Sequence, residues 1–183
     1  MTQHSADDVL AFWFVEHGPS DWFSANADFD ALIAARFADT HAAAARCELW
    51  AWRATPRGRI AEILVLDQFS RQMFRGQAQA FAADPLALAL AQEAVASGAF
   101  GSFDANERQF LLMPFMHAES LAVQEEGVRL FSAHCPEATA NFARAHRDTI
   151  ARFGRFPMRN VALGRESTPA EAEYMAAQAG RMF

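Results

Sequence analysis

Charged side chains interrupt the apolar face of one predicted helix, which spans residues 57–74. Asp67 follows Ile60 by seven residues, so in a continuous helix the two side chains point the same way. Arg71 and Arg75 follow at intervals of four, a spacing at which a guanidinium can form a charge-assisted hydrogen bond to a carboxylate. Burying such a pair costs desolvation free energy. The pattern therefore indicates either a structural ion pair or part of a binding site.

Two histidines also lie on apolar faces. His117 continues the apolar positions of residues 110–121, and His146 shares a helix face with Phe142. A single histidine on an apolar face is usually a hydrogen-bonded core residue, but two of them together with Asp67 indicate a pocket. The same three residues also match a metal set of two histidines and one carboxylate. Because no short metal-ligand spacing accompanies them, we predict no bound metal ion and no cofactor.

The basic residues other than histidine are all arginines: the chain has 16 of them, no lysine, and a formal net charge of −6. Residues 144–165 hold six arginines and a single acid, Asp148. Two of these arginines, Arg155 and Arg159, lie in a short segment that ends at Asn160. A guanidinium can hold a carboxylate or phosphate through two hydrogen bonds, which lysine cannot do. The basic region either pairs with the acidic N-terminal part of the chain or forms a local anion site.

Local start signals divide the chain into helices joined by short connections. The predicted helix starts lie at Ser5, Thr55, Asp84, Asp104, Ser120, Pro136 and Thr168. Apolar spacing of three and four residues dominates, and no segment shows the alternation of a strand. The sequence therefore predicts an all-α fold of seven or eight helices in antiparallel pairs, forming one domain over residues 1–183. Pro114 should kink or break its helix, because its ring clashes with the carbonyl four residues before it.

Composition excludes several classes of protein. A hydrophobic fraction of 52% rules out disorder, and the acidic net charge argues against a nucleic-acid partner. The apolar runs are far shorter than the ~20 residues of a membrane helix, and the first residues carry acids where a signal peptide carries bases. The absence of lysine excludes Schiff-base chemistry. With Cys47 and Cys135 as unpaired thiols, we expect a cytoplasmic protein that contacts neither nucleic acid nor membrane.

Three longer motifs carry a family resemblance. They are LDQFSRQMFRG at residues 66–76, ERQFLLMPFMHAE at 107–119 and FGRFPMRNVALGREST at 153–168. With these motifs the chain resembles, over nearly its whole length, the bacterial domain of unknown function 924 family. The resemblance implies a tetratricopeptide-like helical domain with no established activity. Ser70 and Met158 depart from the family pattern, which often has proline and histidine at these positions.

The residues alone leave three functions open. One is a helical module that binds a small anionic molecule or a peptide in a groove. Another is a hydrolase that uses His117 or His146 as a base oriented by Asp67. The third is a purely structural protein, and the oligomeric state is left undetermined. The candidate ligand-binding residues are Asp67, Arg71, Arg75, His117, His146, Arg155, Arg159 and Asn160.

One spatial expectation concerns the arginine-rich segment, residues 155–160. Its aromatic side chains have apolar area to bury and its guanidinium groups need acceptors. We expect it to fold against the predicted helix 57–74, with Asp67 as the acceptor. Arg71 and Arg75 are then left partly free to face a groove.

Overall fold

Side-chain caps start the helices at several of the predicted positions. In the computed structural model, which describes residues 4–178, Ser5 accepts a hydrogen bond from the backbone N–H of Asp8, and the Asp8 carboxylate accepts one in return. The same reciprocal bonds open two later helices, at Asp104 and Thr168. Within the described residues the chain forms helices and no strand, which confirms the all-α prediction. The number of helices is close to the seven or eight expected.

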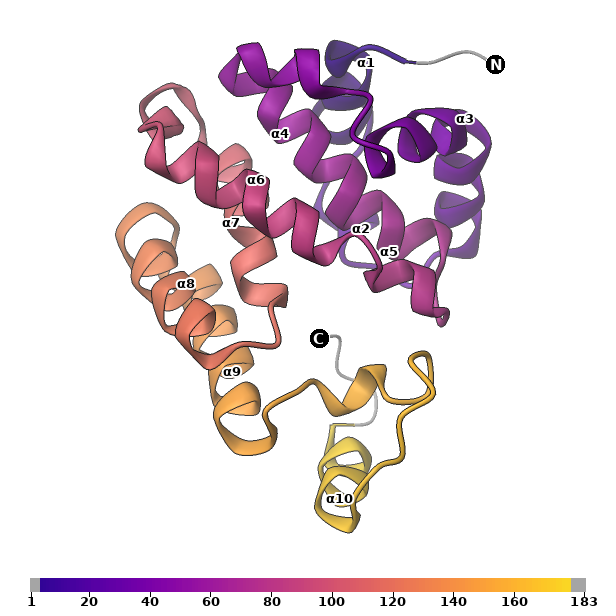
Figure 1. Cartoon of the computed structure of the whole chain (residues 1–183), viewed down its shortest axis with the longest axis vertical. Helices are drawn as coiled ribbons and strands as arrows, with labels where there is room; N and C mark the ends of the chain where they lie inside the picture. Colours follow the sequence, from indigo (N-terminus) through magenta and orange to yellow (C-terminus); the bar gives the residue numbers. More distant parts are fainter. Residues whose placement is uncertain (1–3, 179–183) are drawn as a thin grey trace.

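Figure 1 shows how the helices follow one another from the N-terminus to the C-terminus. The α-helices are α1 (Ala6–Ala11), α2 (Pro19–Trp22), α3 (Ala27–Ala45), α4 (Pro56–Leu64), α5 (Ser70–Met73), α6 (Asp84–Ala96), α7 (Ala105–His117), α8 (Leu121–His134), α9 (Glu137–Phe153) and α10 (Pro169–Ala177). The two π-helices of the described residues are η1 (Phe12–Glu16) and η3 (Val65–Phe69). The short 3-10 helices are η2 (Trp50–Ala54), η4 (Ala78–Phe81), η5 (Ala99–Ser102) and η6 (Pro157–Arg159). None of the helices described is long and apolar enough to cross a membrane. Both ends of the predicted domain, residues 1–3 and 179–183, lie outside the described residues.

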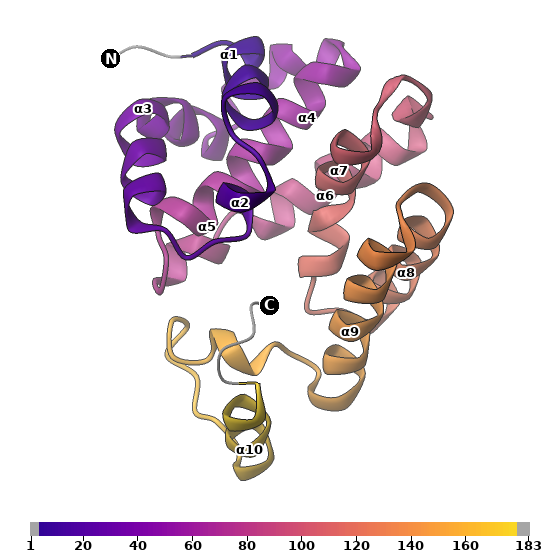
Figure 2. The same cartoon turned by 180° about the vertical axis from the view of Figure 1, so that it is seen from behind.

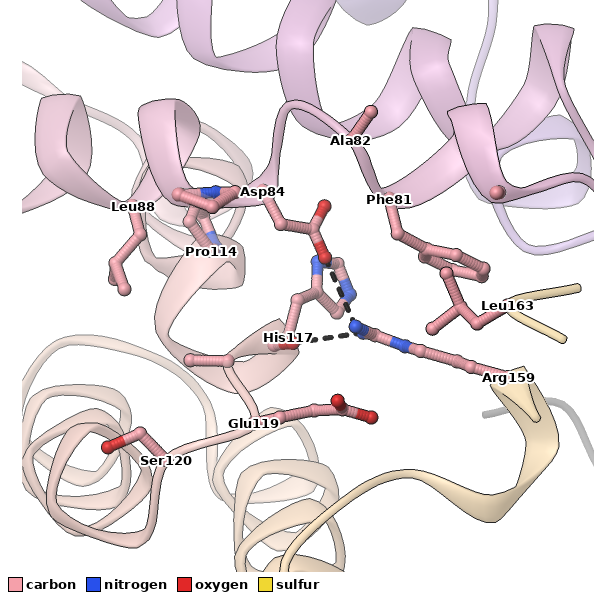
Figure 3. A pocket seen from close by; sticks show the side chains of 13 residues that line it. Phe81, Ala82, Asp84, Leu88, Pro114, His117, Glu119, Ser120, Arg159 and Leu163 are labelled. Atoms are coloured by element: carbon pink, nitrogen blue, oxygen red, sulfur yellow. Dashed lines mark hydrogen bonds and ion pairs between the residues drawn. The ribbon is translucent and has the colours of Figure 1, made fainter. Parts of the chain in front are cut away.

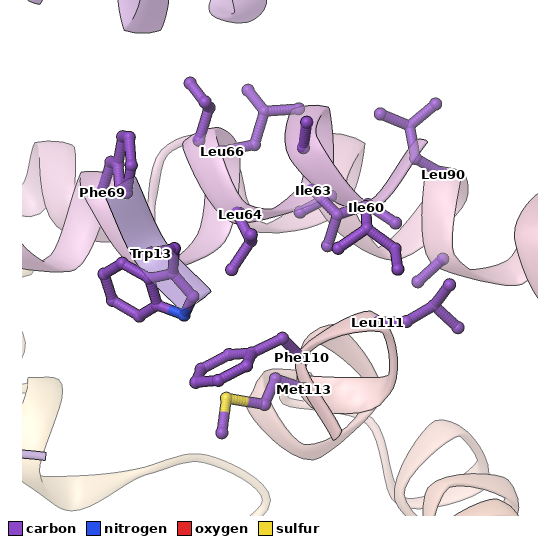
Figure 4. Packing of buried hydrophobic residues seen from close by; sticks show 14 of the residues in the cluster. Trp13, Ile60, Ile63, Leu64, Leu66, Phe69, Leu90, Phe110, Leu111 and Met113 are labelled. Carbon is purple, nitrogen blue, oxygen red and sulfur yellow. The ribbon is translucent and has the colours of Figure 1, made fainter. Parts of the chain in front are cut away.

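The first half of the chain packs around an aromatic core. Phe12, Trp13, Phe37 and Phe69 are completely buried, and Figure 4 shows Trp13 beside Phe69 and Phe110. α1 packs against α4, while α3 packs against η3 and α5. Burial of the apolar area of these rings is the main contribution to the folding free energy of this half.

The predicted helix over residues 57–74 forms as α4, η3 and α5 in direct succession. Its middle turn, η3, is a π-helix, the wider turn that often occurs at functional sites. Every side chain from residue 65 to residue 70 is buried. Asp67 lies in this turn and is therefore held deep in the protein.

The second half stacks consecutive helices. α7 packs against both α6 and α8, and α8 packs against α9 (Figures 1 and 2). The short connections between these helices make neighbours antiparallel. Gly127 allows α7 and α8 to approach closely, because an added Cβ atom would lie 3.1 Å from the Cβ of Phe115. A tetratricopeptide-like arrangement of the whole chain stays a prediction.

Pro114 does not end its helix, so the expected break does not occur. α7 continues for three residues beyond it, to His117. The residues on both sides of the proline are buried in the core. Packing of this segment outweighs the hydrogen bond that proline cannot donate, and His117 thereby occupies the last turn of α7.

The segment after α9 returns to the bundle, but it bonds to the start of α6 and the end of α7 and not, as expected, to the helix 57–74. Gly154 caps α9 in the left-handed conformation, at φ +71°. The backbone N–H of Phe156 then donates to Glu119 Oε1 at 2.7 Å, and Arg165 forms an ion pair with the same carboxylate at 2.7 Å. Arg159 bonds to Asp84 at the start of α6 and to the His117 carbonyl at the end of α7, so the segment is held to both helices.

Candidate functional site

A pocket of about 380 Å³ lies where the returning segment meets α6 and α7 (Figure 3). Its apolar lining consists of Ala78, Phe81, Ala82, Pro85, Leu88, Pro114, Ala118 and Leu163. Its polar lining consists of Asp84, His117, Glu119, Ser120 and Arg159. The pocket thus combines a mostly apolar lining with two carboxylates, one imidazole and one guanidinium.

Asp67 is the buried acid behind this pocket, with a side chain that is 1% exposed. Its Oδ1 lies 2.7 Å from His117 Nδ1 and 3.0 Å from Arg71 Nη1, and its Oδ2 accepts a hydrogen bond from Gln68 at 2.6 Å. Burial alone raises the pKa of Asp67, but the Arg71 guanidinium and His117 outweigh it and hold that pKa below its usual value. Asp67 is therefore a carboxylate at neutral pH.

His117 lies between this carboxylate and the pocket, and its side chain is 15% exposed. Burial and the Arg71 guanidinium lower the pKa of His117, although Asp67 raises it. The imidazole is therefore neutral at pH 7. A carboxylate only accepts hydrogen bonds, so the proton is on Nδ1 and the lone pair is on Nε2.

Asp84 connects the two arginines of the site. It forms a two-pronged ion pair with Arg71, at 2.9 and 3.0 Å, and its Oδ2 lies 3.1 Å from Arg159 Nη1. Arg159 Nη2 donates to the backbone carbonyl of His117 at 2.9 Å. One carboxylate thus serves two guanidinium groups that come from distant parts of the chain.

Arg159 is held between two aromatic rings. Its guanidinium carbon lies 4.6 Å from the ring centroids of both Phe81 and Phe156. Burial and the nearby Arg71 guanidinium lower the pKa of Arg159 to about 10, although Asp84 raises it. The side chain remains a cation at pH 7, but its surroundings compensate its charge less than they compensate that of Arg71, whose pKa the neighbouring carboxylates raise.

Five of the eight predicted site residues lie at or near the pocket. Asp67, Arg71, His117 and Arg159 come together around the pocket through the bonds given above. His146 lies behind them, with its ring centroid 6.5 Å from that of His117, and its Nδ1 donates to the carbonyl of Phe142 at 2.8 Å. Burial lowers the pKa of His146 to about 4, so it too is neutral.

Three other predicted residues do not reach the pocket. Arg75 forms a two-pronged ion pair with Asp30, at 2.7 and 2.8 Å. Arg155 pairs in the same way with buried Glu171, at 2.6 and 2.8 Å. Asn160 accepts a hydrogen bond from Arg165 and donates one to Ser167.

The expected partners of the arginine-rich segment also need correction. Asp67 accepts from none of its guanidinium groups, because Arg71 and His117 already surround that carboxylate. Arg159 instead forms its ion pair with Asp84. Arg71 and Arg75 are not left free, since each is paired with an aspartate.

Sequence reasoning missed the roles of Phe81 and Glu119 in the pocket wall and misjudged that of Asp84. Asp84 was expected only to start a helix, but no side-chain cap is formed there and its carboxylate turns to the arginines. Phe81 and Glu119 gave no local signal, because their roles depend on segments that are distant in the sequence. Among the residues described, no group of three or more histidine, cysteine, aspartate or glutamate side chains could hold a metal ion.

Comparison with known proteins places this geometry in a family. The model of a bacterial protein family of unknown function, DUF924, matches residues 9–179, so the chain belongs to this family. The solved structure of a protein of unknown function from Agrobacterium tumefaciens, ATU0120, is 41% identical and superposes with a TM-score of 0.89. The match covers 94% of this chain and 97% of that one. No curated protein matches the chain.

Proposed function

We propose that this DUF924 protein binds a small carboxylate-containing molecule with an apolar body, in the pocket bounded by Arg159, His117 and Phe81. The observation that carries the proposal is the position of Arg159. Its guanidinium group lines the pocket, is fixed between two rings, and shares the one carboxylate of Asp84 with Arg71. An incoming anion adds a partner to a cation that is already in place, so little side-chain entropy is lost on binding.

The other predicted anion-binding arginines do not share this property. Arg75 and Arg155 each have both prongs of the guanidinium on an aspartate or glutamate of their own. A ligand at either position would have to displace that carboxylate. This contrast supports Arg159 as the anion-binding group.

The dimensions of the pocket support a small molecule over a peptide. Its volume of about 380 Å³ falls at the lower end of the range of ~300–1,000 Å³ that small-molecule sites occupy. Leu88, Pro85 and Leu163 line the pocket and can accept an apolar chain or ring. The ligand class is therefore a small monocarboxylate with an apolar chain or ring.

Isothermal titration calorimetry with hexanoate tests this proposal, with hexanamide as the uncharged control of equal length. We expect hexanoate to bind and hexanamide to bind at least ~10-fold more weakly, since a hydrogen bond to a charged group contributes about 1.5–3 kcal/mol. Arg159→Gln should abolish the preference for hexanoate. Arg75→Gln removes an arginine that is paired outside the pocket and should leave binding unchanged.

Two results would count against the proposal. Equal affinity for hexanoate and hexanamide would show that the charge of Arg159 is not used. If neither hexanoate nor benzoate binds, the arginine–aspartate network serves only to fasten the returning segment to the bundle, which is the structural function.

A further inference from the structure

The hydrogen bond between Asp67 and His117 is unlike the other histidine–carboxylate contacts of the described chain. The carboxylate is buried and fixed by Arg71 and Gln68, and the imidazole it holds lines the pocket. His17 and Asp21 form a similar contact, at 2.9 Å, but that pair lines no pocket wall described here. Among the histidine–carboxylate pairs of the described residues, the first alone combines a buried, fixed carboxylate with an imidazole that lines the pocket.

The geometry fixes the chemical state of His117. Because Nδ1 donates to Asp67, the lone pair of the neutral ring is on Nε2. Within the part of the chain that is described, His117 Nε2 has no hydrogen-bond partner. Figure 3 shows the imidazole on the pocket side, close to the guanidinium of Arg159. A base with a free lone pair therefore lies next to the proposed anion-binding group.

The backbone connects this base to the anion-binding group. Arg159 Nη2 donates to the carbonyl oxygen of His117 itself, at 2.9 Å. A ligand whose carboxylate contacts Arg159 therefore presents the adjoining part of its chain to the His117 ring. Ser120 is the one hydroxyl side chain of the pocket lining, and Figure 3 shows it turned away from His117. Water, and not a serine, is the nucleophile that this arrangement can activate.

We infer that His117, oriented by Asp67, is the general base of a hydrolase that cleaves esters carrying a second, free carboxylate. This inference rests on the proposed function, because Arg159 must hold the free carboxylate. Nε2 of His117 removes a proton from water while the water oxygen forms a bond to the ester carbon. The tetrahedral intermediate then collapses, the bond to the alcohol oxygen breaks, and the proton passes from His117 to that oxygen. The products are a dicarboxylic acid and an alcohol.

The roles of the two residues differ. His117 contacts the reacting water and is the catalytic residue. Asp67 is a positioning residue, since it keeps the hydrogen on Nδ1 and stabilises the imidazolium that forms during the reaction. Arg71 and Gln68 in turn hold Asp67 in place.

Hydrolysis of two chromogenic esters by the full-length protein tests the inference. The probes are the mono-4-nitrophenyl ester of adipic acid, which keeps one free carboxylate, and 4-nitrophenyl hexanoate, which has none. We expect kcat/KM to be at least ~10-fold higher for the charged ester. His117→Gln should lower kcat for that ester at least ~100-fold while hexanoate still binds. His17→Gln alters the matched, partly buried pair outside the pocket and should leave the rate unchanged.

The pH profile distinguishes positioning by Asp67 from a merely structural role. In the unaltered protein the rate should fall as pH drops, with a midpoint below the ordinary histidine value of 6.5. Asp67→Asn removes a negative charge that raises the pKa of His117, so the midpoint should move to lower pH while kcat decreases. A nitrogen-15 NMR spectrum of the unaltered protein should show hydrogen on Nδ1 of His117 and a lone pair on Nε2.

The possible failures are distinguishable. If the charged ester is hydrolysed no faster by the unaltered protein than by His117→Gln, or if NMR places the hydrogen on Nε2, the inference is wrong. If hexanoate still binds in that case, the proposed binding function is retained and only the hydrolase inference is rejected. Absence of hexanoate binding together with absence of hydrolysis overturns both. Because the NMR measurement needs no substitution, a variant that does not fold leaves the test intact.

Discussion

His117 Nδ1 lies 2.7 Å from Asp67 Oδ1, across a separation of 50 residues, and this bond joins the end of α7 to the π-helical turn η3. The contact places a charged carboxylate in the core of the protein and a neutral imidazole on the wall of a pocket. It carries both a stability consequence and a functional one.

Asp67→Ala should destabilise the protein by about 3–5 kcal/mol, because it leaves the Arg71 guanidinium with one of its two carboxylate partners missing in a buried setting. Urea denaturation followed by circular dichroism measures this change. Glu126→Ala is the matched control, since Glu126 pairs with Arg129 on the surface and should leave the free energy of unfolding almost unchanged. Equal stability of Asp67→Ala and the unaltered protein would contradict the buried network.

Arg159→Lys tests whether the planar guanidinium, and not only its charge, is required. Lysine keeps the positive charge but lacks the planar guanidinium that contacts Phe81 and Phe156 and directs fixed N–H groups at Asp84 and the His117 carbonyl. We expect hexanoate affinity to fall about 10-fold in calorimetric titrations. Arg75→Lys changes a paired arginine outside the pocket and should have no effect on binding. Full affinity in Arg159→Lys would reduce the role of Arg159 to that of a simple charge.

Stability should decrease as pH falls from about 6.5 toward 4. Burial lowers the pKa of His146 to about 4, and burial also lowers the pKa of His117. Over this range the unfolded chain binds protons that the folded chain does not, so unfolding becomes easier. For His146 the expected slope is up to ~1.4 kcal/mol per pH unit. Unfolding free energies measured at several pH values should show this slope, and His146→Gln should reduce it.

The attachment of α10 should depend on Glu171. Its hydrogen bonds from Arg155 and from the backbone of Thr168 lower the pKa of Glu171 to about 2. The carboxylate contacts are therefore complete above pH 4.5 and are lost as pH falls toward 2. At neutral pH, Glu171→Gln should accelerate amide hydrogen exchange in α10 and leave exchange in α4 unchanged. Glu173→Gln, at an exposed position in the same helix, serves as the control.

Much of the fold followed from the sequence because its signals act over short distances. A cap such as Ser5 with Asp8 involves residues three apart, and an apolar face repeats every three or four residues. These local rules correctly placed the predicted helix starts and the inward direction of Asp67, but they predicted no start for α2 or α3. Of the kink or break expected at Pro114, the break does not occur, because burial of the surrounding residues keeps α7 helical through it.

The tertiary structure alone decided which charges pair and where the pocket lies. The chain holds 16 arginines and 22 acids, and nothing local selects among their combinations. Arg159 meets Asp84 across 75 residues, and Arg155 takes Glu171 although Asp67 was the expected partner. Ion pairing has no sequence period; it depends on which surfaces the packing of apolar faces brings together. The sequence by itself determined that this protein is helical and that Asp67 points inward, whereas the path of the chain after α9 determined that Arg159 closes the site beside His117.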